Sequence, residues 1–193
     1  MDYQHTAAPI RNLDDLQRHL AAGQAVEYLF FWGHTPAPGA GRVGKECLSQ
    51  WYPAPFTIAG TLYPTAEHWM MAEKARLFGD EANRQAVIGS THPDQAKKYG
   101  RRVQSFDAAQ WEAARFDLVV RGNEAKFGQH PALREFLLAS GERVLVEASP
   151  VDAIWGIGLA QHDARALTPA AWRGLNLLGF ALMEVRARLQ RQL

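Results

Sequence analysis

A carboxylate and an ammonium group stand seven residues apart in the segment TLYPTAEHWMMAEK at 61–74. Positions three, four and seven apart share one face of a helix, so Glu67 and Lys74 line up. Most glutamates at a helix start only stabilise the helix through its macrodipole. The large apolar residues at 69–71 predict that Glu67 is partly buried, and a partly buried carboxylate beside an ammonium can serve acid–base or electrostatic catalysis. Burial would raise the pKa of Glu67 and Lys74 would lower it, and the sequence leaves the balance open.

The elements around Glu67 are expected to hold it rigidly. Short apolar runs at 56–58 and 61–63 flank Ala59-Gly60, which predicts a hairpin with a tight turn before the Glu67 helix. The other expected elements are helices at 13–22, 64 or 65 to 78, 91–100, 105 or 107 to 127, 131–141 and 178–189, strands at 25–32 and 143–148, a lid-like loop at 33–48 and an irregular segment at 149–174. This order predicts a single compact, mostly helical α+β domain with a few short strands.

The composition limits the class of protein. The chain has 193 residues, 47% of them hydrophobic, and its 21 basic and 20 acidic residues leave a net charge of +1. Such a balance provides no overall field toward nucleic acid or an anionic membrane. The single cysteine, Cys47, excludes an internal disulfide and suits a reducing cytosol, so we expect a cytoplasmic protein. The N-terminal residues lack the apolar core of a signal peptide, and no apolar run is long enough to span a membrane.

Several motifs follow one another in the order of a known family. The segment YPTAEHWMMAEKARLFGD resembles the pattern YPTxEHxxxxxKAxxFGD of the NADAR (YbiA-like) domain family. Further matching segments are FFWG at 30–33, SQWYPAPF at 49–56, AKKYGRRV at 96–103, EAKFGQHPALREFLLAS at 124–140, LVEASPVDAIWGIGL at 145–159 and NLLGFALMEVR at 176–186. The resemblance covers about residues 28–190. We therefore expect an N-terminal helical extension at 1–24 and a NADAR N-glycosidase domain at 25–193.

The resemblance implies cleavage of the C1–N bond of a ribose that carries a 5′-phosphate. Some members of the family act on phosphorylated ribosylamino-pyrimidine intermediates of riboflavin biosynthesis, which are reactive and damaging. Others remove ADP-ribose from guanine bases. A module that binds ADP-ribose without turnover is a further possibility, and an interaction domain without a small-molecule site is the plainest one. Nucleic acid would be a partner only if ADP-ribosylated bases are the substrate. The oligomeric state stays open.

The resemblance also implies roles for the charged residues. Cleavage of the bond develops positive charge at C1, which Glu67 would stabilise or meet with an activated water. Glycosidases usually employ two carboxylates, and Asp152 is the second candidate, although it could simply hydrogen-bond its own turn. Glu147 ranks lower because strand alternation places it on one face of a sheet. Lys74 is a solvated lysine, a phosphate anchor or a nucleophile that forms a Schiff base.

The phosphate end of such a substrate requires positive charge. Lys97, Lys98, Arg101 and Arg102 surround Gly100 at an expected helix end, and most such runs are a solvated face. Arginine suits bidentate phosphate binding, so we predict Arg101 as the phosphate ligand, with the Gly100 backbone beside it. The second candidate is Lys126, although lysines at helix ends often only interact with the dipole.

The base end requires a flat apolar surface. Candidates for stacking are Trp32, Trp51, Trp69 and Trp155, although large aromatic residues are more often core. Trp155 is favoured because Gly156 follows it in a loop beside Asp152. Asn176 either hydrogen-bonds the substrate or caps the last helix.

No metal site or cofactor is expected. Glu67-His68 has the wrong order and spacing for an HExxH zinc motif, so His68 is more simply a hydrogen-bonded core or site residue. Three features depart from the family pattern: SQW at 49–51 replaces SNF, Ala66 replaces a serine, and the 33–48 loop is long. These changes bear on the identity of the leaving base more than on the type of reaction.

Overall fold

The structure is a computed structural model that describes residues 10–36 and 42–192. The first nine residues of the predicted extension and residues 37–41 of the predicted lid lie outside this description. The chain divides into two compact units. Unit 1 consists of Met1–Phe31 and Glu142–Glu184, and unit 2 consists of Trp32–Gly141 and Val185–Leu193.

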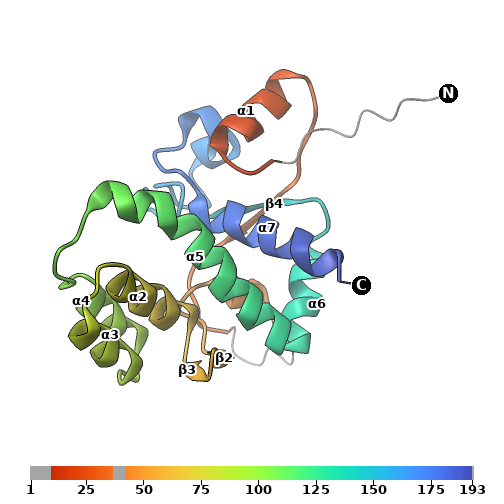
Figure 1. The fold of residues 1–193 in the computed structure, drawn as a ribbon. Helices are drawn as coiled ribbons and strands as arrows, with labels where there is room; N and C mark the ends of the chain where they lie inside the picture. Colours follow the sequence, from red (N-terminus) through yellow and green to blue (C-terminus); the bar gives the residue numbers. More distant parts are fainter. Residues whose placement is uncertain (1–9, 37–41, 193) are drawn as a thin grey trace. The chain divides into compact units, whose positions relative to one another are not determined.

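Unit 2 contains most of the helices, in agreement with the predicted helical α+β class (Figure 1). Its elements are a 3₁₀ turn η1 (Lys45–Leu48), strands β2 (Phe56–Ile58) and β3 (Thr61–Tyr63), and helices α2 (Ala66–Leu77), α3 (Glu81–Ile88), α4 (Pro93–Gly100), α5 (Ala108–Gln129) and α6 (Pro131–Ala139). Helix α2 packs against α3, α4 and α5, and nine of its twelve residues are buried. A helix that is buried on nearly every side is the central element of its unit.

The predicted hairpin before α2 is confirmed. Strands β2 and β3 pair antiparallel, with Phe56 opposite Tyr63. Both turn residues are left-handed, with φ of 48° at Ala59 and 79° at Gly60, which is the conformation of a two-residue turn that matches strand twist. Tyr63 contacts Trp69 of α2 edge-on, with 5.2 Å between the ring centres. The hairpin is thereby coupled to the start of α2.

Helix α3 is an α-helix that the sequence pattern does not predict. Asp80 caps it by accepting a hydrogen bond from the backbone N–H of Asn83, and only Val87 is buried among its eight residues. Because its apolar stripe is so short, the helical period is hard to recognise in the sequence. Packing against α2 and α4 supplies the stability that the pattern lacks.

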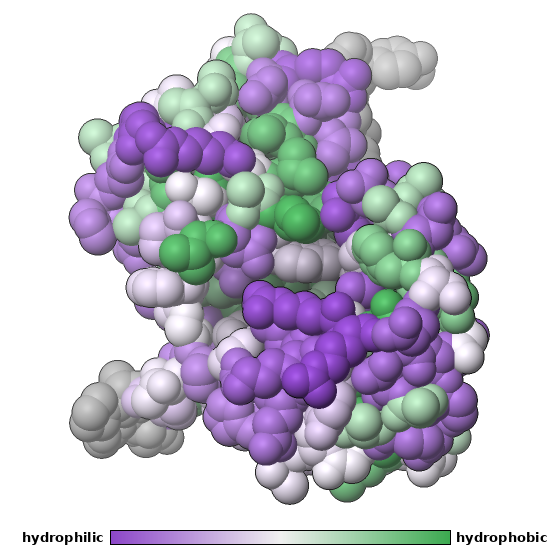
Figure 2. Space-filling model, turned by 90° about the vertical axis from the view of Figure 1, so that its left-hand side faces the viewer, coloured by the Kyte–Doolittle hydropathy of each residue, from purple (hydrophilic) through white to green (hydrophobic). Residues whose placement is uncertain are grey.

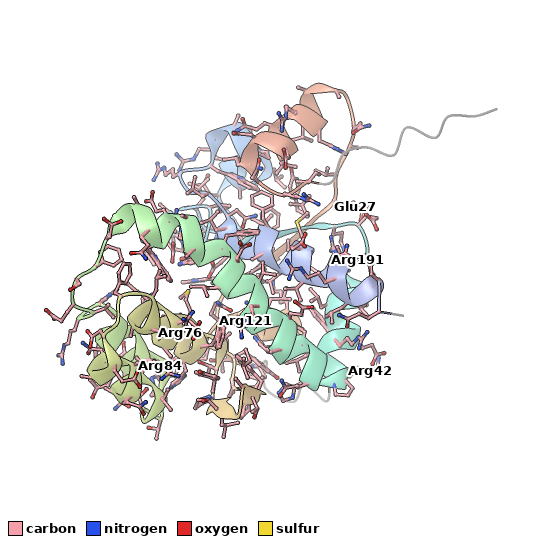
Figure 3. All side chains as sticks on the ribbon, in the orientation of Figure 1. Glu27, Arg42, Arg76, Arg84, Arg121 and Arg191 are labelled. Carbon is pink, nitrogen blue, oxygen red and sulfur yellow. The ribbon has the colours of Figure 1, made fainter. Side chains whose placement is uncertain are left out.

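Helix α5 packs closely on α2 at Gly122. The indole of Trp69 occupies the space where a side chain at position 122 would lie, and its Nε1 donates to the Leu118 carbonyl at 2.7 Å. Arg121 projects from α5 on the side of α2, and its guanidinium carbon lies 5.2 Å from the centre of the Trp69 ring (Figure 3). The contact depends on the absence of a side chain at Gly122.

We expect Gly122→Ala to lower the free energy of unfolding by roughly 1–3 kcal/mol, because the added methyl group collides with the Trp69 ring. Gly128→Ala is the matched control on the same helix. An added Cβ there meets no atom within 4 Å, so alanine is expected to stabilise the helix by about 0.5–1 kcal/mol. Urea unfolding of both variants measures the difference, and effects of the same sign would contradict the packing argument.

Unit 1 is built on a short parallel ribbon. Its elements are α1 (Leu13–Ala21), β1 (Tyr28–Phe31), β4 (Val144–Glu147), the 3₁₀ turns η2 (Ala164–Leu167) and η3 (Pro169–Ala171), and α7 (Leu177–Gln190) up to Glu184. Strands β1 and β4 are parallel, with Tyr28 opposite Val144. The helix predicted at 13–22 is confirmed as α1, and Asn12 caps it by accepting from the Asp15 N–H at 2.9 Å. Helix α1 contacts η3, while the predicted boundary after residue 24 stays a prediction.

Within the described residues, no helix is long and apolar enough to cross a membrane.

Candidate active site

The predicted carboxylate lies in the first turn of α2. Thr65 caps the helix, and Glu67 follows with only 3% of its surface exposed. The Glu67 backbone N–H donates to the Gln50 carbonyl at 2.9 Å, which holds the helix start against the segment before the hairpin. The sequence predicts partial burial of Glu67, and in the structure its burial is nearly complete. The positive end of the helix dipole favours a negative charge at this position.

His68 is enclosed beside Glu67 and is fully buried. Its Nδ1 lies 2.8 Å from Thr65 Oγ1, and the same hydroxyl accepts from the His68 backbone N–H at 3.4 Å. Burial lowers the pKa of His68, with a smaller opposing effect of a hydrogen bond to Ser90, so the imidazole is neutral at pH 7. Among the described residues, no group of three His, Cys, Asp or Glu side chains is placed to hold a metal ion. His68 is a hydrogen-bonded residue of the helix start.

Lys74 lies two turns after Glu67, on the half-buried part of α2. Its ammonium stands over the rings of Phe106, 4.4 Å from the ring centre, and of Trp111, at 5.7 Å. Burial lowers the pKa of Lys74, and repulsion from Arg101 lowers it further. Lys74 and Arg101 thus form a pair of neighbouring cations, which is an arrangement that a phosphate group would stabilise. The sequence alone does not indicate that Phe106 and Trp111 lie beside Lys74.

The structure separates the four cations around Gly100. Lys98 pairs with Asp94 at 2.6 Å, and Arg102 lies over the ring of Tyr99. Lys97 instead lies 5.7 Å from the ring centre of Trp51. Figure 2 views the molecule from the side of α3 and α4 and shows hydrophilic side chains over much of the surface that these helices form.

Gly100 itself has a packing role. The space where its side chain would lie is filled by Met71, so α4 approaches α2 closely at this point. The role predicted for it, a backbone contact to phosphate beside Arg101, stays a prediction. Arg101 is exposed at the end of α4 and is free of the packing contacts that enclose Gly100.

Trp51 is half-buried and surrounded by imidazole and ammonium groups. His34 lies 5.7 Å from it between ring centres, and His92 meets it edge-on at 6.2 Å. With Lys97, these groups leave a flat indole among hydrogen-bond donors and cations. Such a surface suits a planar, polar or anionic ligand. The sequence analysis names neither histidine as a site residue. Trp32 is 59% exposed, and its stacking role stays a prediction.

Lys126 is enclosed within unit 2 rather than presented to a ligand. It is fully buried on α5, and its ammonium donates to the carbonyls of Cys47 at 2.7 Å and Ser49 at 2.8 Å. Lys126 was predicted as a phosphate ligand or a partner of the helix dipole, but its buried ammonium has a structural role instead. It fixes the segment that carries Gln50 and Trp51. Burial lowers its pKa from 10.5 to about 7.

This lowered pKa predicts a pH-dependent stability. Between about pH 7 and 10.5 the unfolded chain binds a proton at Lys126 that the native chain does not, so the free energy of unfolding rises with pH. The rise is at most about 1.4 kcal/mol per pH unit. Urea unfolding at several pH values should show it in the wild type and not in Lys126→Met. A parallel pH dependence in the two proteins would show that Lys126 keeps its ordinary pKa.

The residues predicted in unit 1 lie in one tightly bonded loop. Asp152 Oδ1 accepts from the backbone N–H groups of Ile154 and Trp155, both at 2.8 Å. Asp152 thus hydrogen-bonds its own turn, which is one of the two roles predicted for it. Its other carboxylate oxygen, Oδ2, takes no part in these two hydrogen bonds. A side chain at Gly156 would approach the Glu147 carbonyl to 2.8 Å, so Gly156 is needed for close packing of the loop on β4. Contacts of Asp152, Trp155 or Gly156 with a substrate stay predictions.

Asn176 stabilises the edge of β4. Its side chain is fully buried, donates to the Leu145 carbonyl at 2.9 Å and accepts from the Glu147 N–H at 2.9 Å. Its backbone is left-handed, with φ of 52°, which asparagine tolerates better than most residues. The Asn176 amide thus makes the hydrogen bonds with β4 that the backbone of a neighbouring strand would otherwise make. The hydrogen bonds that were predicted for a substrate or a helix cap go to the backbone of β4.

Comparisons with known proteins agree with the motif order. The family described as NADAR domain matches residues 30–190. N-glycosidase R617 of Acanthamoeba polyphaga mimivirus is 39% identical over 169 residues, which cover 85% of this chain and 97% of that protein. N-glycosidase YbiA of Escherichia coli (strain K12) is 34% identical over 135 residues, 70% of this chain and 76% of that protein.

Two further comparisons concern a longer relative and a solved structure. Riboflavin biosynthesis protein VVA0006 of Vibrio vulnificus is 33% identical over 143 residues, which cover 74% of this chain and 35% of that protein. The NMR structure of the E. coli protein YbiA matches the fold with a TM-score of 0.69 and 28% identity, covering 86% of each chain. With the family match extending over most of the sequence, the chain belongs to the NADAR domain family.

Proposed function

We propose that this chain is an N-glycosidase that hydrolyses the ribose C1–N bond of phosphorylated ribosylamino-pyrimidine intermediates of riboflavin biosynthesis. The relatives named N-glycosidase support a hydrolase acting on N-glycosyl bonds. The name of the V. vulnificus relative, a riboflavin biosynthesis protein, supports this substrate class. The observation that carries the proposal is a nearly enclosed carboxylate, Glu67, in the first turn of the central helix of unit 2.

Glu67 acts at the sugar carbon. When the C1–N bond breaks, positive charge spreads over C1 and the ring oxygen, and a nearby carboxylate stabilises it. Burial strengthens this interaction because water is not there to screen it. Water then adds its oxygen to C1 and its proton goes to the departing amine nitrogen. Water is the only co-reactant in this step.

Lys74 and Arg101 bind the 5′-phosphate. Burial lowers the pKa of Lys74 and repulsion from Arg101 lowers it further, and a bound phosphate dianion would offset that repulsion. Trp51, with Lys97 beside it, provides a surface for the planar base. The exposed indole of Trp32 and the half-buried indole of Trp155 are further candidates for that role.

Asp152 is the proposed second carboxylate and belongs to unit 1, whereas Glu67 belongs to unit 2. Its Oδ1 holds the 152–155 turn, and Oδ2 takes no part in those two hydrogen bonds. The cytoplasmic location rests on the sequence prediction from the single cysteine.

The test is release of ribose 5-phosphate from the ribosylamino-pyrimidine 5′-phosphate by the wild-type protein. Release at a rate above that of the enzyme-free reaction supports the proposed substrate. No release, together with release of ADP-ribose from ADP-ribosyl-guanosine, would establish the alternative substrate within the same reaction class. Affinity for ADP-ribose without turnover of either compound would establish a binding module instead.

A further inference from the structure

Two buried amides meet beside the start of α2. Gln50 is 6% exposed and Asn123 of α5 is fully buried. Asn123 Nδ2 donates to Gln50 Oε1 at 2.9 Å and to the Val119 carbonyl at 2.9 Å. The two side chains come from segments 73 residues apart, so the contact exists only in the folded unit.

The orientation of both amides follows from the backbone. The Val119 carbonyl can only accept, so the atom of Asn123 that faces it must be the NH₂ group. That group also faces Gln50, so the atom of Gln50 that meets it must be the oxygen. Rotating either amide by 180° would bring two donors or two acceptors together. The outer corners of the pair are therefore a donor, Gln50 Nε2, and an acceptor, Asn123 Oδ1.

Neither outer atom has a hydrogen-bond partner among the residues that the structure describes, and both are buried. Buried polar atoms are nearly always paired in native proteins, because an unpaired one has lost its water without replacement. A hydroxyl group that accepts from the first atom and donates to the second would satisfy both of them at once. The pair thus carries one unpaired donor and one unpaired acceptor, which is the complement of a hydroxyl.

The position of the pair connects it to Glu67. The Gln50 carbonyl accepts from the Glu67 N–H at 2.9 Å, so the same residue holds the helix start and carries the outward donor. Lys126 holds the preceding carbonyls of Cys47 and Ser49, which keeps this segment in place. In a sugar whose C1 faces Glu67, the hydroxyl nearest to C1 is the one on C2, and the amide pair is joined to the Glu67 helix start through the Gln50 carbonyl.

We propose that Gln50 Nε2 and Asn123 Oδ1 bind the 2-hydroxyl of the substrate ribose and select ribosyl over 2-deoxyribosyl compounds. This inference rests on the proposed function for the identity of the sugar. Hydrogen bonds to the 2-hydroxyl strengthen as positive charge develops at C1, so the pair also contributes to catalysis. Gln50 stands in the SQW segment, where this chain departs from the SNF of the family pattern.

The test is calorimetric binding of ribose 5-phosphate and 2-deoxyribose 5-phosphate to the intact protein, which requires no turnover. We expect the wild type to bind the ribose compound about 10- to 100-fold more tightly. Gln50→Met, which removes the donor, should reduce this ratio to less than about threefold by weakening only the ribose compound. Gln129→Met is the control, because that amide pairs with the backbone of Thr57 in the hairpin.

Each outcome decides the proposal. Equal affinities of the wild type for the two sugars, no binding of either, or a ratio that survives in Gln50→Met would overturn it and assign the amides to a buried water. If Gln50→Met fails to fold, Gln50→Glu keeps the acceptor for Asn123, replaces the donor by an oxygen, and should lose the same discrimination. A wild type that discriminates between the sugars but releases no ribose 5-phosphate would retain this site and refute the proposed reaction.

Discussion

Replacing Glu67 by Gln is expected to lower kcat for C1–N cleavage by about 10²- to 10⁴-fold while the protein stays folded. The amide keeps the size of the side chain in a position that is only 3% exposed, but it lacks the charge that stabilises the developing cation. The measurement is ribose 5-phosphate release under saturating substrate, with circular dichroism to confirm the fold. KM should change little, because the charge acts mainly on the transition state.

Glu73→Gln is the matched control for this prediction. Glu73 is also 3% exposed and lies on the same helix, but its two carboxylate oxygens pair with the Nε of Arg76, at 3.0 and 2.9 Å. Loss of the Glu73 charge should lower the free energy of unfolding and leave kcat unchanged. Full turnover in Glu67→Gln, or equal losses of kcat in the two variants, would show that Glu67 only stabilises the start of α2.

Replacing Lys74 by Met is expected to raise KM for the phosphorylated substrate by about 10- to 100-fold, with a smaller change in kcat. Methionine preserves the contacts with Phe106 and Trp111 but removes the ammonium that stands over them. Lys74→Arg should restore most of the affinity, because a guanidinium also binds phosphate. A loss of kcat that arginine does not restore, together with an adduct trapped by borohydride, would identify Lys74 as a nucleophile instead.

The same lysine predicts the pH dependence of KM. Its pKa is lowered by burial and by Arg101, so it loses its charge at a lower pH than an ordinary lysine. The phosphate monoester is already a dianion above about pH 7. KM of the wild type should therefore rise as the pH increases toward the lowered pKa of Lys74, and KM of Lys74→Met should not show this rise. Measurement of KM across the alkaline range in both proteins checks the sign.

Much of the fold around Glu67 could be predicted because its signals are local. The hairpin requires two residues of positive φ at Ala59-Gly60, and the capped helix requires Thr65 before an apolar run. The burial of Glu67 also followed from its neighbours in the sequence. Helix α3 was not predicted, because eight residues with one buried position carry almost no periodic signal.

Side-chain roles were predicted less well, because they depend on partners that are distant in the sequence. Asn176 was expected at a substrate or a helix cap, but it pairs with the backbone of β4 about 30 residues earlier. Lys126 was ranked as a phosphate candidate, but its ammonium is enclosed by carbonyls nearly 80 residues away. A charged or amide side chain has the same appearance in a sequence whether it faces solvent, a ligand or the core.

The sequence by itself determined the family, the helical α+β class and the face that Glu67 and Lys74 share, because these depend on motif order and on the period of one helix. Only the tertiary structure decided which cations are paired within the protein and which buried amide atoms have no hydrogen-bond partner among the described residues. Lys98 forms an ion pair with Asp94, and Lys126 donates hydrogen bonds to two carbonyls. Arg101 instead lies close enough to Lys74 to lower its pKa. Hydrogen bonds and charge pairs are satisfied by proximity in space, and the folding of the chain alone establishes that proximity.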